Sequence, residues 1–368
     1  MNGRDADADP DAGSAPDADA DTEFVRARDD LEFDELTTDA SFTTIDTHTG
    51  GEPTRIVVSG IDRSALTGDS VRERRDSFAE THDWVRDLLM REPRGHDDMF
   101  GAVVVDADRP DADVGVFFMD SRGYLDMCGH GTIGVVSALL ELDRLDRRET
   151  IRVETPAGLV EATPEYVPDG GVECVTIQNV RSFVYDQATV PVSFLDSSLR
   201  VDVVYAGNFF ALVDSDQLGL PVEPQHAATF VDWGLEIRDA VNERLDIVHP
   251  LTGEEGSISI TEIYGTPDEV DRSIVVFGEG QVDRSPCGTG TCAKMALLHD
   301  AGALDVGESY LHESIVGTRF EGRLVAAEER DGVTLTTPLI TGSARITGKH
   351  TFVKDAKDSL SGFSISAE

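Results

Sequence analysis

One short motif occurs twice in this chain, and this duplication limits the possible folds more than any other feature. Residues 128–134 read Cys-Gly-His-Gly-Thr-Ile-Gly, and residues 287–293 read Cys-Gly-Thr-Gly-Thr-Cys-Ala. In each copy the glycines give the backbone freedom at a turn, and a Pro-free stretch with apolar residues at helical spacing follows. The motif therefore predicts two helices, each capped by a cysteine. Free backbone N–H groups at such a helix start point at any anion in front of them, and a thiol there ionises more easily than a free one.

The duplication extends beyond the motif. Glu154 and Glu313 each lie 26 residues after their cysteine, while Gly50 and Gly207 lie 78 and 80 residues before theirs. The period is near 159 residues, far above the roughly 20 to 50 residues of solenoid repeats. The chain is therefore predicted to form two domain-sized halves. If these halves face each other, each contributes one thiol and one N–H-rich turn to a shared cleft.

Hydrophobic patterning predicts strand-rich halves, each with one central helix, which is typical of a mixed α+β fold. In the first half we expect helices over 77–90 and 129–142 and strands at 42–46, 54–59, 101–105, 114–118, 151–154, 158–163 and 173–180. In the second half we expect helices over 231–244 and after residue 287, and strands at 200–205, 208–213, 257–263, 273–277 and onward to about 351.

Two thiols on either side of a ligand indicate a specific chemistry. A thiolate can remove a proton from one face of a carbon and a thiol can return one to the other face, which is racemisation or epimerisation. We assign these roles to Cys128 and Cys287. Cys174 and Cys292 are interpreted as small buried hydrophobes. A disulfide between the repeated cysteines is disfavoured, because a reducing compartment is expected and redox pairs more often occur as C-x-x-C.

At this point the chain resembles the proline racemase family, which also includes 4-hydroxyproline epimerases and trans-3-hydroxyproline dehydratases. The matching stretches are residues 46–55, 92–101, 127–132 and 283–291, and the resemblance covers about 43–355. It implies two pseudo-symmetric α/β domains of the diaminopimelate-epimerase type, each a curved, mostly antiparallel sheet around a central helix, with the active site between them. The expected domains are 43–185, to which a C-terminal strand at about 343–360 returns, and 186–342.

The resemblance also implies how a substrate is held. Its carboxylate should lie between the two helix starts and accept backbone N–H groups on both sides, from Gly129, His130, Gly288 and Thr289. Asp283 matches the family position that accepts the imino nitrogen, with the His130 side chain beside it. Phe277 is interpreted as an aromatic wall of the pocket.

No cofactor and no metal are expected. Lys294, the one lysine near a motif, is interpreted as a solvated or interface residue rather than as the anchor of a pyridoxal group. His48 and His96 lie in Gly-rich loops, but their spacing matches no metal-ligand pattern.

Several functions remain to be separated. Cysteine at both positions disfavours the family's dehydratases, in which the second position is generally Thr. Phe277 and the segments 96–101 and 118–125 look more like proline racemases than 4-hydroxyproline 2-epimerases, whose pockets tend to be more polar. Diaminopimelate epimerase shares the two-thiol logic with different motifs. A non-catalytic amino-acid-binding protein would not need both thiols.

Composition limits partners and location. The chain has 71 acidic and 31 basic residues and a net charge of −40, which disfavours nucleic acid and anionic membranes as partners. Only 4 of the basic residues are lysines, and we interpret this balance as that of a cytoplasmic protein of a high-salt organism. No stretch is typical of a signal peptide or a spanning helix. Residues 1–40 are predicted to be a disordered acidic tail, and a homodimer is expected only from the resemblance.

Overall fold

The computed structural model describes residues 38–365, so the predicted acidic tail at 1–40 lies almost entirely outside the described residues. The first half contains β1 (Ala40–Thr49), β2 (Glu52–Ser59), α2 (Val71–Met90), β3 (Phe100–Val105), β4 (Val114–Asp120), β5 (Tyr124–Leu125), α3 (Gly129–Glu141), β6 (Ile151–Thr155), β7 (Gly158–Tyr166) and β8 (Val172–Gln178). After β9 (Phe183–Val190), the second half contains β10 (Leu199–Tyr205), β11 (Phe209–Asp214), α4 (Ala227–Arg244), β14 (Ile258–Gly265), β15 (Asp271–Phe277), β16 (Gln281–Asp283), α5 (Gly288–Asp300), β17 (Ser309–Ser314), β18 (Arg319–Arg330), β19 (Val333–Gly342) and β20 (Ala344–Lys354). A short hairpin, β12 (Ile247–Val248) and β13 (Glu255–Gly256), follows α4.

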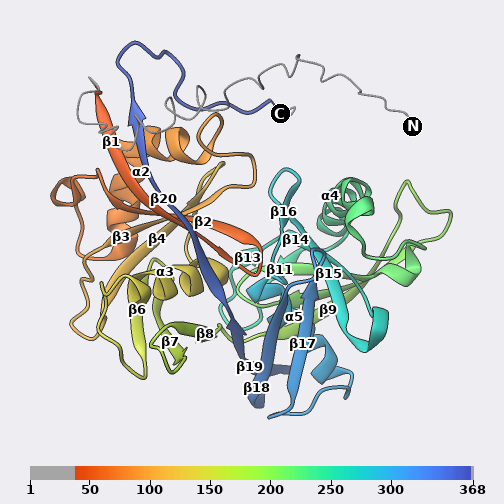
Figure 1. The fold of residues 1–368 in the computed structure, drawn as a ribbon. Helices are drawn as coiled ribbons and strands as arrows, with labels where there is room; N and C mark the ends of the chain where they lie inside the picture. The colour runs from red at the N-terminus through yellow and green to blue at the C-terminus, as the bar shows by residue number, and fades with distance from the viewer. Residues whose placement is uncertain (1–37, 366–368) are drawn as a thin grey trace, which may run out of the picture.

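Strand pairing runs through one continuous sheet whose two ends mirror each other (Figure 1). From the central β8–β19 pair, one side continues outward as β7, β6, β4, β3, β2, β1 and β20. The other side continues as β18, β17, β15, β14, β11, β10 and β9. The parallel pairs also occupy equivalent places: β2–β3 and β4–β6 on one side correspond to β11–β14 and β15–β17 on the other. The predicted α+β class and its internal repeat are therefore confirmed, while the division into domains stays a prediction.

The central strands are buried on both faces. Along β4, Phe118 belongs to the apolar core around α3 and α5, and its neighbour Phe117 belongs to the core under α2. Along β15, Val275 and Val276 divide in the same way between the core around α3 and α5 and the core under α4. Successive strand residues point to opposite faces, so a strand covered on both sides is a continuous apolar run. Each half thus holds one helix inside the curve of its sheet and one outside it.

Several elements differ from the sequence prediction: α4 begins at Ala227 rather than near residue 231, and the short strands β5, β12, β13 and β16 were not predicted. Helix α2 begins at Val71 rather than near residue 77, because the Ser70 side chain accepts the Glu73 N–H at 3.2 Å and the Glu73 side chain accepts the Asp69 N–H at 2.7 Å. This capping box stabilises a first turn that is too charged to show helical apolar spacing. Strand β9 was not predicted at all.

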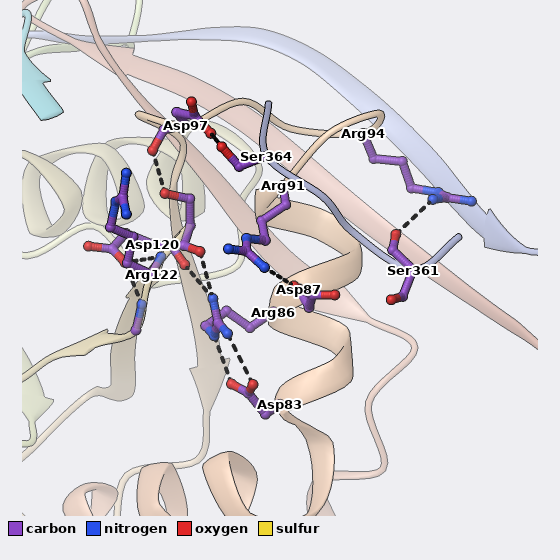
Figure 2. Close-up of polar contacts among 12 residues, drawn as sticks. Asp83, Arg86, Asp87, Arg91, Arg94, Asp97, Asp120, Arg122, Ser361 and Ser364 are labelled. Carbon is purple, nitrogen blue, oxygen red and sulfur yellow. Dashed lines mark hydrogen bonds and ion pairs between the residues drawn. The ribbon is translucent and has the colours of Figure 1, made fainter. Parts of the chain in front are cut away.

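The loop after α2 links the two halves. Asp98 on this loop accepts hydrogen bonds from Arg284 Nη2 at 2.7 Å and from the Val282 N–H at 3.1 Å. The C-terminal segment after β20 holds the same loop from outside, where Arg94 donates to the Ser361 carbonyl and Ser364 donates to Asp97 (Figure 2). The chain end therefore braces the segment that closes the first half onto the second. No helix within residues 38–365 has the length and apolar character needed to cross a membrane.

Candidate active site

Cys128 and Cys287 are the N-cap residues of α3 and α5. Each Sγ accepts the N–H three residues along, from Gly131 and Gly290, at 3.3 Å in both cases. The sulfurs thus occupy the place that a Ser, Asp or Asn oxygen usually takes at a helix start. Cys287 has φ +60°, a left-handed conformation that only surrounding structure can hold in a residue with a side chain.

The two helix starts meet at Gly129 and Gly288. A Cβ on Gly129 would lie 3.7 Å from the Gly288 Cα, and a Cβ on Gly288 would lie 2.6 Å from Ile340 Cδ1. Only glycine fits at position 288 without moving its neighbours. The close approach brings two sets of free helix N–H groups to one small space.

A cavity of about 90 Å³ opens in front of these helix starts. All eight residues singled out from the sequence line it: Cys128, Gly129, His130, Phe277, Asp283, Cys287, Gly288 and Thr289. Residues that the sequence analysis did not assign complete the wall: Phe100, Leu125, Met127, Asn208, Ile260 and Val275. The wall is mostly apolar, with the two thiols, one carboxylate and a few hydrogen-bonding groups set into it.

Each thiol has a polar neighbour two residues along the chain. His130 Nδ1 lies 3.3 Å from Cys128 Sγ, and Thr289 Oγ1 lies 3.5 Å from Cys287 Sγ. Burial lowers the pKa of His130, which keeps the imidazole neutral. Its ring packs edge-on against Phe100, and its carbonyl accepts the Thr49 hydroxyl at 2.9 Å.

Asp283 ends β16 and is buried, with 7% of its surface exposed. Its Oδ1 accepts the Ser285 N–H at 2.7 Å, and Ser285 Oγ in turn accepts the Cys287 N–H at 3.1 Å. This double turn fixes both the carboxylate and the cysteine that follows it.

The ionisation of the thiols differs from the sequence prediction. Burial raises the pKa of both, and the Asp283 carboxylate raises that of Cys287 further. The helix N–H groups of Gly131 and Gly290 do lower both values, as expected for a helix start, but the loss of hydration outweighs them. Both thiols are therefore harder to ionise than free cysteine.

A second carboxyl near the cavity carried no assignment in the sequence analysis. Glu52 is fully buried, and its Oε2 accepts the Arg284 N–H at 2.6 Å. Burial, and then the charge of Asp283, raise the pKa of Glu52 well above its usual value. Its place in the motif at 46–55 was the available signal, but the motif does not show that the side chain crosses to the other half.

The interpretation of Lys294 as a solvated residue was wrong. Lys294 is 4% exposed, and its Nζ lies 3.5 Å from Asp271 Oδ2 and 3.3 Å from the Tyr264 ring centre. His48 lies near the end of β1 rather than in a loop, His96 lies in the loop after α2, and neither lines the cavity. Within residues 38–365 no group of three or more potential ligand side chains has the arrangement of a metal site.

Known proteins resemble this chain over most of its length. The family model described as proline racemase matches residues 44–364. The chain belongs to the proline racemase family. It is 42% identical over 326 residues to a proline racemase of Clostridioides difficile, which covers 87% of this chain and 96% of the relative. It is also 42% identical over 323 residues to a 4-hydroxyproline 2-epimerase of Streptosporangium roseum, covering 86% and 96%. A solved family structure, a hydroxyproline epimerase from Agrobacterium vitis with bound trans-4-hydroxy-L-proline, is 30% identical with a TM-score of 0.77, covering 88% of this chain and 96% of that one.

Proposed function

We propose that this protein is a cofactor-independent proline racemase, which interconverts L- and D-proline by transfer of the Cα proton between two thiols. One observation carries the proposal: two cysteines from opposite halves of the chain cap two facing helices and line one cavity. Membership of the proline racemase family, together with the similarity to racemases and epimerases, supports the same reaction.

The helix starts supply the site for the substrate carboxylate. In α3 the Gly131 N–H is held by the Cys128 thiol and the Thr132 N–H by the Cys128 carbonyl, which leaves the N–H groups of Gly129 and His130. In α5 the Gly290 N–H is held by the Cys287 thiol and the Thr291 N–H by the Cys287 carbonyl, which leaves the N–H groups of Gly288 and Thr289. Four donors and two helix dipoles can hold a carboxylate and stabilise the negative charge that develops on it when the Cα proton leaves.

Proton transfer then needs one thiolate and one thiol. The thiolate removes the Cα proton from one face, and the thiol on the other side delivers its own proton to the opposite face, so the two exchange states in each turnover. The imino nitrogen of the substrate, held by Asp283, brings a positive charge that favours thiolate formation in this otherwise unfavourable environment. The reaction thus begins only when the substrate is bound.

The cavity wall favours proline over 4-hydroxyproline. Phe100 and Phe277 pack 5.8 Å apart between ring centres, and Ile260, Val275, Leu125 and Met127 add further apolar surface. A ring hydroxyl buried there without a partner would cost about 1–3 kcal/mol. The alternative is 4-hydroxyproline 2-epimerisation, for which Asn208 is an available polar partner. Dehydration of trans-3-hydroxy-L-proline is disfavoured because position 287 is Cys rather than Thr.

The substrate can be decided directly. Purified protein is incubated in D₂O and high salt with L-proline, trans-4-hydroxy-L-proline and trans-3-hydroxy-L-proline in separate samples, and NMR follows Cα deuterium and products. We expect deuterium at Cα and D-proline from the first sample to form fastest. Faster epimerisation of the second substrate would establish the alternative, and a dehydrated product from the third would contradict both.

The two-thiol mechanism is tested by Cys128→Ser and Cys287→Ser. A serine hydroxyl is hardly ionised at neutral pH, so each variant should lose proline racemisation by at least about 10²–10⁴-fold. Cys174→Ser, at a partly exposed thiol away from the cavity, is the matched control and should keep wild-type activity. Full racemisation by one of the two cavity variants would require a one-base mechanism.

We further propose a cytoplasmic location in a high-salt organism and assembly as a homodimer. The strongly acidic composition supports the first of these, and the family resemblance supports the second.

A further inference from the structure

Behind the Cys287 helix lies a buried group of ionisable residues that the proposed reaction does not use. Glu262 on β14 and His312 on β17 both have fully buried side chains, and Glu262 Oε1 lies 3.4 Å from His312 Nε2. Both Glu262 oxygens and His312 Nε2 lack a hydrogen-bond partner of ordinary geometry among the described residues, and the 3.4 Å approach is the contact between the two side chains. The Ser273 hydroxyl also faces Glu262 and lowers its pKa. An isolated charge at this depth would be costly, so the two groups depend on each other.

The first half of the chain has no such pair. His312 and Val153 each lie 25 residues after their cysteine, and they occupy the same place in the pairings β15–β17 and β4–β6. Glu262 pairs with Val275 on β15 as Ala102 pairs with Phe118 on β4. The equivalents of the ionisable pair are thus Ala102 and Val153, both in the apolar core. The sheet does not require charged groups here, because the mirrored half is built without them.

The pair lies close to Cys287 in two ways. A Cβ on Gly290 would lie 2.5 Å from Glu262 Oε2 and 3.1 Å from the Cys287 Cβ, so a space of one methyl group separates the carboxyl from the cysteine. His312 Nδ1 lies 3.0 Å from Thr291 Oγ1, and this hydroxyl donates to the Cys287 carbonyl at 2.8 Å. In the first half the place below Gly131 is taken by Phe118. The carboxyls that raise the pKa of Cys128 are Asp283, Glu52 and Asp120, none of which lies at the position equivalent to Glu262.

These contacts fix the protons. Because the Thr291 hydroxyl donates to the Cys287 carbonyl, it must accept from His312, and His312 Nδ1 carries the proton. His312 Nε2 is then an acceptor, and a protonated Glu262 is the donor that faces it. Burial agrees with this assignment, since it raises the pKa of Glu262 to about 8 and lowers that of His312 to about 3. The pair is neutral near pH 7 and gains one negative charge when Glu262 ionises.

We propose that the Glu262–His312 pair is a buried titrating group that holds Cys287 in its thiol form at alkaline pH and so makes the two cavity thiols unequal. The inference rests on the proposed function for its role in turnover, but the pair and its effect on Cys287 do not depend on it. The pair acts as a positioning and electrostatic group, because the hydrogen bonds lead to the Cys287 carbonyl and not to its sulfur.

Other ionisable groups face Glu262 from the elements packed around it: Tyr264, Asp271, Asp283, Lys294, Tyr310 and Cys292. Lys294 and Asp271 lie 3.5 Å apart, and Lys294 lowers the pKa of Glu262 by more than Asp271 raises it. Asp283 raises the pKa of Glu262 further, while Lys294 opposes the rise. The remaining groups are neutral over the pH range of interest, which leaves Glu262 as the group whose charge changes.

The test measures the two thiols separately. Full-length wild type and Glu262→Gln are alkylated with iodoacetamide at pH 7.0 and 9.5, and mass spectrometry of peptides gives the rate at each cysteine. Gln keeps the shape of the side chain but cannot ionise. Glu313→Gln is the matched control, because Glu313 is next to His312 on the same strand, points to the other face of the sheet and is bound by Arg272 and Arg319.

We expect wild type and Glu262→Gln to agree within about twofold at pH 7.0, where Glu262 is protonated. At pH 9.5 the Cys287 of Glu262→Gln should react roughly tenfold faster, the factor for about one pKa unit. Cys128 should be unchanged, and the control should match wild type at both cysteines. Equal Cys287 rates at pH 9.5, an equal change at Cys128, or the same ratio at both pH values would overturn the proposal.

A second readout covers the cases of poor folding or blocked alkylation. Glu262→Ala/His312→Val copies the residues of the first half, and the pH profile of kcat/KM for proline needs no reagent. Racemisation needs one thiol and one thiolate, so a Cys287 that ionises more easily moves the alkaline limb of both variants to lower pH. An unmoved limb contradicts the proposal. If no substrate is racemised but the alkylation rate of Cys287 alone changes, the proposed function is wrong and the role of the pair is supported. If proline is racemised but the alkylation rate of Cys287 is unchanged, the proposed function is supported and the role of the pair is wrong.

Discussion

Asp283→Asn separates substrate binding from thiol ionisation, because the two effects have opposite signs. Asn keeps the shape of the side chain, and its oxygen can still accept the Ser285 N–H that fixes the turn before Cys287. The change removes only the negative charge. If Asp283 holds the imino nitrogen, the bound substrate loses a buried ionic contact.

The size of the loss follows from burial. Asp283 is 7% exposed, and removing one partner of a buried, hydrogen-bonded charge pair costs about 2–5 kcal/mol. Because Asn retains a neutral acceptor, we expect about 2–3 kcal/mol, which is a roughly 30- to 150-fold loss in kcat/KM at about 1.4 kcal/mol per tenfold. The thiols respond in the other direction. The Asp283 charge is the largest contribution after burial to the raised pKa of Cys287, so its removal should make Cys287 easier to ionise and faster to alkylate.

Polarimetry of L-proline in high salt gives kcat/KM, and iodoacetamide labelling gives the rate at Cys287. Asp202→Asn is the control, since Asp202 is 8% exposed, binds Gln187 Nε2 at 2.6 Å and does not line the cavity. A kcat/KM within about threefold of wild type, or slower labelling of Cys287, would refute the role given to Asp283.

Two further predictions concern stability. The whole chain has a net charge of −40, and residues 1–40 hold 14 acidic and 3 basic residues, so residues 41–368 carry −29. Because the screening length falls from ~10 Å at 0.1 M salt to ~3 Å at 1 M, the melting temperature should rise steeply with KCl. A melting temperature that stays flat as KCl is raised would contradict the high-salt interpretation. Arg284→Ala removes the 2.7 Å ion pair with Asp98 that joins the halves. Because both side chains are partly exposed, the free energy of unfolding measured in urea should fall by only about 1 kcal/mol. The KM for proline should rise as the closed form becomes less populated, and an unchanged KM would show that the pair does not hold the cavity shut.

The sequence predicted the parts of the site that the repeat marks twice. Cys128 and Cys287 stand out because two helix caps with one spacing are improbable by chance, and the glycines beside them identify the free N–H groups. Glu52 and Asp98 were not assigned, because their contacts with residues near 284 join segments about two hundred residues apart and leave no local pattern.

Lys294 shows a different failure. This charged residue on a helix near a motif was interpreted as solvated or as part of an interface. The repeat makes it the equivalent of Val135, a fully buried residue of α3. Position 294 is therefore an interior position, and its lysine is held by Asp271 and Tyr264. Comparing each residue with its equivalent in the other copy would have identified Lys294 as buried. The same comparison identifies Glu262 and His312.

The order of strands in the sheet has a consequence for how such a chain arose. β9 follows β8 in the chain but pairs with β10 of the other half, and β20 follows β19 but pairs with β1. Each repeat thus gives its last strand to its twin, and the Thr347 side chain bonds the Asp46 carbonyl 301 residues away. One repeat alone would leave an open sheet edge and a loose strand, which two identical copies can satisfy by reciprocal exchange. End-to-end fusion of the two subunits of a strand-swapped dimer would produce this arrangement. Within one chain the two copies need not stay identical, so one half can carry the ionisable residues around Glu262 where the other has apolar core residues.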